Sequence, residues 1–255
     1  MRPDVVFTAS AAGYFTKASD GALEDGDVIG IFAMDPLDVA NVKGTVAGRS
    51  VTPQVPVKWE LNQKKPTRFA AYMPYDGTLA SWNSTFYVKP DQSVYSSYAQ
   101  SDLRYSVCDA KPESQVDFLF QHALSKLVVV MGDGEAIKSV TTGELALNAT
   151  LNLVDGSLAP GNYKGPVTLG KAVEANGGRG FVGILVPQSG TFPLNVTLES
   201  GQTIQATLAD AATLESGVAY LATVGQGDGG AVRFTLSVIP WGDGGQMSYG
   251  KPKQQ

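Results

Sequence analysis

Regular alternation of apolar and polar residues in the C-terminal half constrains the fold of this chain more than any other feature. Segment 192–198 reads FPLNVTL, and segment 203–208 reads TIQATL after the turn-forming pair Ser200-Gly201. Segments 218–224 and 232–238 repeat the alternation. Because successive side chains of a strand point to opposite faces, this period directs one set into a core and the other to solvent. Two such segments one turn apart predict an antiparallel hairpin with a single buried face.

The amino-acid usage also favours strands over helices. Charged residues make up 17% of the chain, whereas about 25% is typical of soluble domains. The 29 Gly and 14 Pro residues divide the sequence into short apolar segments bounded by turn formers. Long amphipathic helices would need more charged residues on their outer faces. We therefore predict an all-β fold class.

The N-terminal half gives fewer regular strand signals. Segment 28–34 (VIGIFAM) is almost continuously apolar, which is typical of a strand covered on both faces. At the start of the chain, Val5, Phe7 and Ala9 alternate with their neighbours. This alternation predicts a short N-terminal strand with one apolar face.

A change of composition near the middle of the chain suggests a domain boundary. A chain of 255 residues has room for one large or two modest domains. Segment 109–114 (DAKPES) is polar, contains a proline and precedes a new apolar segment. We expect domains at 1–113 and 114–245, followed by a polar flexible tail at 246–255.

Charge and residue counts argue against several classes of function. The net charge is −5 and the Lys and Arg residues are scattered, which argues against nucleic-acid binding. Cys108 is the only cysteine and His122 the only histidine, so we expect no metal site, no cofactor and no internal disulfide. We interpret His122 as a structural histidine and Cys108 as an inert thiol. A pair of carboxylates can hydrolyse a glycoside, but no motif selects two of the 24 acidic residues, so we expect no enzyme.

No apolar segment approaches the roughly 20 residues that a membrane-spanning helix needs. The first residues, MRPD, lack the hydrophobic region of a signal peptide. We expect any export signal to be absent from this chain.

Aromatic residues are concentrated between residues 59 and 105, where ten of them lie. Buried, they would form the bulky core of a β-sandwich with short strands, which is the interpretation we favour. Exposed, they would stack on sugars or on a protein partner. Under that second interpretation the candidate ligand-facing side chains are Trp59, Trp82 and Tyr87.

Four segments occur in an order that resembles a known family. They are DVIGIF at 27–32, FQHALSKL at 120–127, LVPQ at 185–188 and IPW at 239–241. This order resembles the fimbrillin-like (Mfa-like) family of Bacteroidetes surface proteins over residues 5–241. The segment FQHALSKL is the most specific of the four.

The resemblance implies two tandem β-sandwich domains of transthyretin-like, Greek-key topology. It also implies a lipoprotein precursor exported to the outer membrane, attached only through its lipid, and a mature protein in a cell-surface fimbrium. The partners would be other pilin subunits, joined by strand exchange. The polar residues after Trp241 make a poor donor strand, which favours a tip, accessory or anchor position over a stalk position.

In this family a protease removes the N-terminal strand, and a strand of a neighbouring subunit replaces it. The exchangeable strand here would contain Val5, Phe7 and Ala9, and the candidate processing positions are Arg2 and Lys17. The alternative is a cell-surface β-sandwich lipoprotein that binds a host glycan or protein and does not polymerise.

Overall fold

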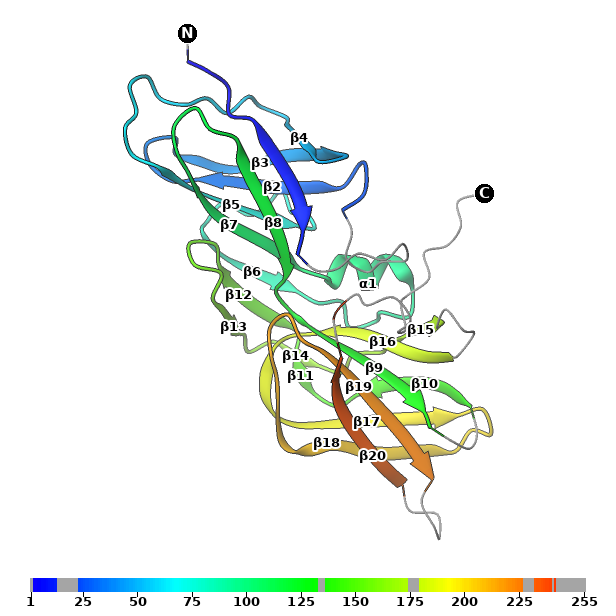
Figure 1. The fold of residues 1–255 in the computed structure, drawn as a ribbon. Coiled ribbons are helices and arrows are strands. Elements are labelled where there is room, and N and C mark those ends of the chain that lie inside the picture. Colours follow the sequence, from blue (N-terminus) through cyan, green and yellow to red (C-terminus); the bar gives the residue numbers. More distant parts are fainter. Residues whose placement is uncertain are drawn as a thin grey trace.

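The computed structural model describes residues 2–12, 23–132, 136–173, 179–226, 232–239 and 241. This part of the chain forms an elongated molecule in which two β-rich units lie end to end (Figure 1). A short helix, α1 (Tyr95–Ser101), lies beside the junction of the two units. No helix in the described ranges has the length and apolar character needed to cross a membrane.

Seven strands of the first unit close into a barrel in the order β1-β4-β3-β2-β5-β7-β8. They are β1 (Phe7–Ala11), β2 (Val28–Ala33), β3 (Val39–Ala47), β4 (Ser50–Pro53), β5 (Thr67–Met73), β7 (Arg104–Ala110) and β8 (Val116–His122). Strand β1 completes the barrel because it pairs antiparallel with β4 and parallel with β8. Closure leaves no free edge in the sheet that these seven described strands form.

The barrel has a core on the inside and a second core against one outer face. Ile29 and Ile31 of β2 are buried inside the barrel. Phe32 of the same strand is buried in the core of the second unit, together with Tyr72 of β5. Strand β2 is therefore covered on both faces, and the prediction from the continuous apolar segment 28–34 is confirmed.

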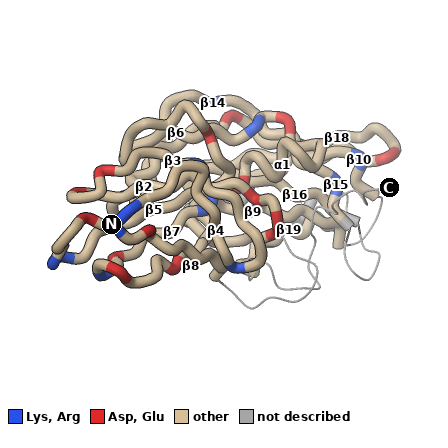
Figure 2. Tube along the Cα trace, turned by 90° about the horizontal axis from the view of Figure 1, so that it is seen from above, with Lys and Arg blue, Asp and Glu red and all other residues tan. Residues whose placement is uncertain are grey.

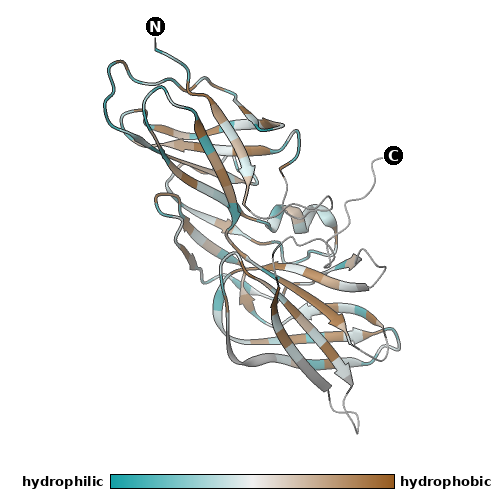
Figure 3. Cartoon of the chain, viewed as in Figure 1, coloured by the Kyte–Doolittle hydropathy of each residue, from teal (hydrophilic) through white to brown (hydrophobic). Residues whose placement is uncertain are grey.

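The second unit contains a five-stranded and a three-stranded sheet whose inner faces share one core. The larger sheet has the order β15-β16-β9-β19-β20, and the smaller has the order β10-β17-β18. Their strands are β9 (Ser125–Met131), β10 (Ile137–Thr142), β15 (Gly170–Val173), β16 (Arg179–Leu185), β17 (Gln188–Leu198), β18 (Thr203–Leu214), β19 (Ala219–Gln226) and β20 (Val232–Ile239). Val129 of β9 and Val196 of β17 are fully buried in the same core. Figure 3 shows hydrophobic residues gathered along the strands of both units.

The hairpin predicted from segments 192–198 and 203–208 is confirmed. Strands β17 and β18 pair antiparallel, with Thr197 opposite Thr203 across the turn. Phe192, Leu194 and Val196 are each at most 2% exposed, so the apolar set of the alternation faces the core. Strands β19 and β20 form a second antiparallel hairpin.

Two small sheets complete the fold, and one of them pairs a strand from the first half of the chain with a strand from the second. One has the order β13-β12-β6 and the other pairs β11 with β14. Their strands are β6 (Asn83–Tyr87), β11 (Leu145–Ala146), β12 (Asn148–Asn152), β13 (Leu158–Pro160) and β14 (Lys164–Gly165). Strand β6 precedes the last barrel strands in sequence but pairs with β12 of the second half.

The predicted all-β fold class is confirmed, whereas the architecture of the first unit differs from the sandwich that we expected. It is a closed barrel because β1 bridges β4 and β8, which would otherwise be the edges of an open sheet.

Strand pairing crosses the expected domain boundary between residues 113 and 114, since β8 belongs to the barrel. The tail at 246–255 lies outside the described residues.

Candidate functional site

The N-terminal strand is held by backbone hydrogen bonds along its whole length. Residues Phe7–Ala11 pair in parallel with Val116–Phe120 of β8. Upstream of β1, the Val5 N–H donates to the Val57 carbonyl (2.8 Å). The Trp59 N–H donates to the Pro3 carbonyl (3.0 Å). The first residues of the chain are therefore a continuous extended segment between two other parts of the barrel.

The apolar face of this segment fills the barrel. Val5, Phe7 and Ala9 are 5%, 2% and 2% exposed, whereas Val6 between them is 58% exposed. The Phe7 ring lies 5.8 Å, centroid to centroid, from the rings of both Phe69 and Phe118. Withdrawal of β1 would uncover these rings and leave β4 and β8 as unpaired edges. The single apolar face predicted from the sequence is present.

The two candidate processing positions, Arg2 and Lys17, lie on opposite sides of β1 in the sequence. Arg2 is exposed and forms an ion pair with Glu60 at 2.8 Å. A cut after Arg2 would leave β1 attached to the barrel. Lys17 lies outside the described residues, downstream of the end of β1 at Ala11. A cut after Lys17 would separate β1 from the rest of the chain.

The three candidate ligand-facing aromatic residues differ in burial. Trp59 is 1% exposed and packs edge-to-face on Phe69 inside the barrel, so its assignment as a ligand-facing residue is wrong. Trp82 is half-buried against Phe32, with ring centroids 5.5 Å apart. Tyr87 is 57% exposed at the end of β6. Of the three, only Tyr87 presents most of its surface to solvent.

Tyr87 contacts a second exposed tyrosine that the sequence analysis missed. Tyr163, which is 58% exposed, lies with its ring centroid 6.2 Å from that of Tyr87 and at 65° to it. Tyr163 follows β13 and lies far from the aromatic segment 59–105 in sequence. Its flanking residues, Gly161-Asn162 and Lys164-Gly165, are turn-forming or polar, and this was the signal for an exposed position.

A hollow of about 470 Å³ opens beside Tyr87. Its lining includes Tyr75 and Asp76 from the segment after β5, Lys89 from the segment after β6, and Gln100 from α1. A second hollow, of about 450 Å³, shares Pro74, Tyr75 and Gln100 with the first. The two hollows therefore adjoin at Tyr75, on the side of the molecule that carries α1.

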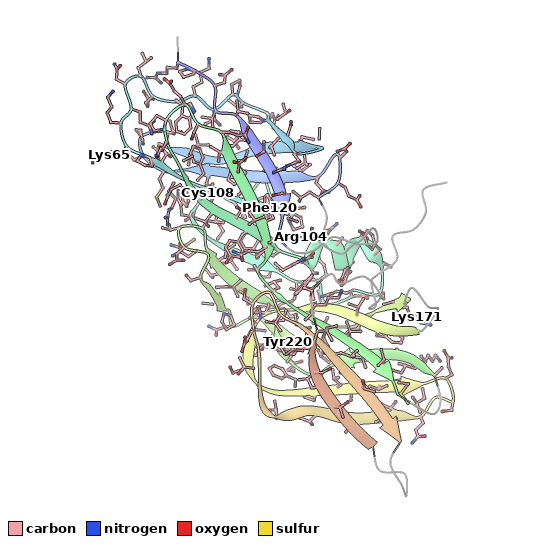
Figure 4. All side chains as sticks on the ribbon, viewed as in Figure 1. Lys65, Arg104, Cys108, Phe120, Lys171 and Tyr220 are labelled. Atoms are coloured by element: carbon pink, nitrogen blue, oxygen red, sulfur yellow. The ribbon has the colours of Figure 1, made fainter. Side chains whose placement is uncertain are left out.

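A buried polar network lies where the barrel meets the second unit. His122 Nδ1 lies 2.6 Å from Asp102 Oδ1, and Arg104 Nη2 donates to Asp102 Oδ2 at 2.7 Å. Figure 4 shows Arg104 near this junction. Burial opposes ionisation of Asp102, but Arg104 and the contact with His122 outweigh it and hold the pKa of that carboxyl below its ordinary value.

The described residues around His122 are not arranged as a nucleophilic centre. Ser216 lines the same hollow as His122, but its hydroxyl donates to the Ala123 carbonyl at 2.7 Å. A nucleophilic serine would direct that proton to the histidine. Burial raises the pKa of the Cys108 thiol to about 11, so this thiol is protonated at neutral pH. Among the described residues, no group of three metal-ligating side chains is present.

Comparison with known proteins identifies relatives over nearly the whole chain. A family model described as fimbrillin-like matches residues 16–241. No curated protein matches the chain. A putative cell adhesion protein from Bacteroides uniformis has 24% identity and a TM-score of 0.72, over 93% of this chain and 99% of its own.

Two further solved structures show the same fold. A putative cell adhesion protein from Bacteroides ovatus has 18% identity and a TM-score of 0.76, over 94% of this chain and 98% of its own. The C-terminally truncated tip fimbrial protein Mfa3 from Porphyromonas gingivalis has 13% identity and a TM-score of 0.56, over 94% and 100%. At these identities the likeness establishes a shared fold.

Proposed function

Because this chain belongs to the fimbrillin-like family, we propose that it is a non-enzymatic pilus subunit that joins its neighbours by exchange of the N-terminal strand. The observation that carries the proposal is the place of β1 in the barrel. It is a terminal segment with one buried face, it pairs with strands on both sides, and it closes the sheet. A strand of similar pattern from another chain would fit the same groove.

The free energy gained when a strand binds in the place of β1 is comparable to the stability of a whole domain. Burial of a Val or Phe side chain contributes about 1.5–3 kcal/mol, and Val5 and Phe7 are both buried. Each backbone hydrogen bond to a neighbouring strand adds about 1 kcal/mol. The stability of a whole domain is only about 5–15 kcal/mol. Loss of β1 would therefore produce a strong tendency to bind a replacement strand.

The finer parts of the proposal concern location and position in the fibre. We place the protein at the cell surface, exported as a lipoprotein precursor and assembled at the outer membrane. Its fold is shared with a tip fimbrial protein, and the residues after Trp241 are polar and rich in glycine. Both observations favour a tip, accessory or anchor position over a stalk position. A transthyretin-like, Greek-key topology of the second unit is also part of the proposal.

The proposal is tested by removal and replacement of the N-terminal strand. We expect a chain lacking residues 1–12 to form oligomers or to precipitate, as seen by size-exclusion chromatography with light scattering. A synthetic peptide of residues 2–12 added in trans should restore the monomer. A peptide carrying Phe7→Asp should fail to do so, whereas the matched control Val6→Asp should succeed because Val6 faces solvent. A truncated chain that stays monomeric with an unchanged melting temperature would refute strand exchange.

Processing is tested separately on cells. Mass spectrometry of the mature N-terminus, combined with incorporation into filaments, distinguishes the two positions. A start after Lys17 in filaments supports removal of β1 before assembly. A lipidated start upstream of Arg2 in the same filaments would show that assembly does not require the cut.

A second candidate function is favoured by the exposed Tyr87–Tyr163 pair. A cell-surface protein that binds a glycan or protein and does not polymerise would also present such a surface. The two functions are compatible, since an adhesive tip subunit would perform both.

A further inference from the structure

We propose that Tyr87, Tyr163 and the adjoining hollow form a binding site for a neutral oligosaccharide, which we call the tyrosine site. The proposal is independent of strand exchange, because the site lies on the sheet formed by β6 and β12 and contains no residue of β1. It requires only that the protein reaches a surface on which glycans are presented.

The first argument is the exposure of the two rings. Among the side chains that the structure describes, Tyr87 and Tyr163 are the only aromatic ones classed as exposed. They come from separate segments and nevertheless contact each other. Aromatic residues are otherwise buried or half-buried throughout the described chain. Two solvent-facing rings in one place form a stacking surface, with the phenolic hydroxyls available as donors and acceptors.

The second argument is that the pair is held in place before any ligand binds. Tyr87 lies opposite Asn148 in the pairing of β6 with β12. The Asn148 side-chain oxygen accepts a hydrogen bond from the Tyr163 N–H at 3.0 Å. The Leu147 N–H donates to the Tyr163 carbonyl at 2.8 Å. Both backbones are thus fixed to β12 and its neighbouring residue, which reduces the entropy lost on binding.

The third argument is the chemistry of the hollow beside the rings. Its volume of about 470 Å³ lies within the roughly 300–1,000 Å³ usual for small-ligand sites. Tyr75 and Phe86 supply apolar surface, while Asp76, Lys89 and Gln100 supply charged and amide groups. Sugars present apolar C–H faces and hydroxyl edges, so they require this mixture of aromatic and hydrogen-bonding groups. The adjoining hollow of about 450 Å³ beyond Tyr75 adds length, which favours an oligosaccharide over a single sugar.

Charge favours a neutral ligand. The first hollow is lined by one carboxylate, Asp76, and one ammonium group, Lys89. The adjoining hollow has no excess of cations either, since it is lined by Glu24, Asp27 and Asp102 against Lys43 and Arg104. Lys and Arg are interspersed with Asp and Glu over the described molecule (Figure 2). A sialylated or sulfated glycan would require an excess of cationic side chains at the site. A purely apolar peptide would cover the Lys89 ammonium and the Gln100 amide without offering them hydrogen-bond partners, which disfavours such a ligand.

The experiment uses the full chain and an array of neutral and sialylated oligosaccharides of two to six units. We expect binding to neutral members. Titration of the best one should show at least a tenfold weaker affinity for the double variant Tyr87→Ala/Tyr163→Ala. Tyr87→Phe, which keeps the ring, should lose less affinity than Tyr87→Ala. Leu61→Ala is the control, because Leu61 is 59% exposed but belongs to the loop before β5.

Equal melting temperatures of the variants will show that they fold. Three outcomes would overturn the proposal: no neutral glycan binds, only sialylated glycans bind, or the double variant binds as tightly as the original chain. None of these outcomes bears on strand exchange, so the two proposals fail separately.

Discussion

The imidazole of His122 stacks on the indole of Trp241, with ring centroids 4.0 Å apart and planes inclined by 23°. His122 is the last residue of the barrel strand β8. Trp241 follows β20 of the second unit. The Nδ1 atom of the same imidazole lies 2.6 Å from Asp102 Oδ1. One histidine thus links the end of the barrel, a buried carboxylate and the end of the last strand.

Replacement of Trp241 should loosen this junction. Trp241 is half-buried, so we expect Trp241→Ala to reduce the free energy of unfolding by about 1–2 kcal/mol, less than the 3–5 kcal/mol typical of a fully buried Trp. Trp241→Phe keeps an aromatic ring over His122 and should lose less. Urea unfolding monitored by circular dichroism provides the measurement. An alanine variant as stable as the original chain would show that the stacking contributes nothing.

Stability should fall in acid partly through Asp102. Its pKa is lower in the folded chain than in the unfolded chain, so the folded state binds fewer protons. The resulting stabilisation is complete above the unfolded value of about 4 and is lost as the pH falls below it. Melting temperatures between pH 7 and pH 3 should show this decline.

Asp102→Asn should remove that part of the acid dependence. It should also reduce stability at pH 7 by about 3–5 kcal/mol, because Arg104 would remain buried without its carboxylate. Asp91→Asn is the matched comparison, because hydrogen bonds from Ser93 lower the pKa of Asp91 at an exposed position, so this variant should remove much less of the acid dependence than Asp102→Asn does. If both variants keep the acid dependence of the original chain, Asp102 is not its source.

Local patterns in the sequence predicted the strands well and their long-range pairing poorly. The alternation at 192–208 specified which faces of β17 and β18 are buried, because burial follows directly from the period of two. The closed barrel depends on pairing between β1 and β8, whose partners are more than a hundred residues apart. No local period encodes that contact, so the barrel was not predicted.

For the candidate site too, the features that belong to one segment were predicted and those that join distant segments were not. The apolar face of Val5, Phe7 and Ala9 was predicted correctly, because it is a property of one segment. Trp59 was a ligand-facing candidate only under the interpretation that we did not favour, and the alternation of Val57-Lys58-Trp59, which directs both apolar residues to one face, already favoured the buried position that it has. The network of Asp102, Arg104 and His122 joins two segments that only the fold brings together.

The two faces of the N-terminal segment should respond differently to truncation of their side chains. Phe7→Ala leaves a cavity beside Phe69 and Phe118, and should reduce the free energy of unfolding by about 3–5 kcal/mol. Val6→Ala changes a side chain that is 58% exposed and should stay within about 0.5 kcal/mol of the original. Denaturant unfolding of both variants tests this directly. Equal effects would contradict the orientation of the segment.

Two glycines with positive φ should differ in their tolerance of a methyl group. Gly48, at φ +59°, has no atom within 4 Å of an added Cβ. Gly156, at φ +78°, would place a Cβ 2.6 Å from the Tyr105 hydroxyl oxygen and 2.7 Å from its Cζ. Gly48→Ala should therefore lose only the backbone preference, about 1 kcal/mol. Gly156→Ala adds overpacking against the ring and should lose about 2–4 kcal/mol.

A double-mutant cycle separates the two contributions at Gly156. In a Tyr105→Ala background the obstructing ring is absent, so Gly156→Ala should lose no more stability than Gly48→Ala does in the original chain. Urea unfolding of the four variants of the cycle and of Gly48→Ala provides the measurement. If Gly156→Ala loses as much stability with Ala at position 105 as with Tyr, the ring is not the obstacle, and the backbone conformation alone accounts for the glycine.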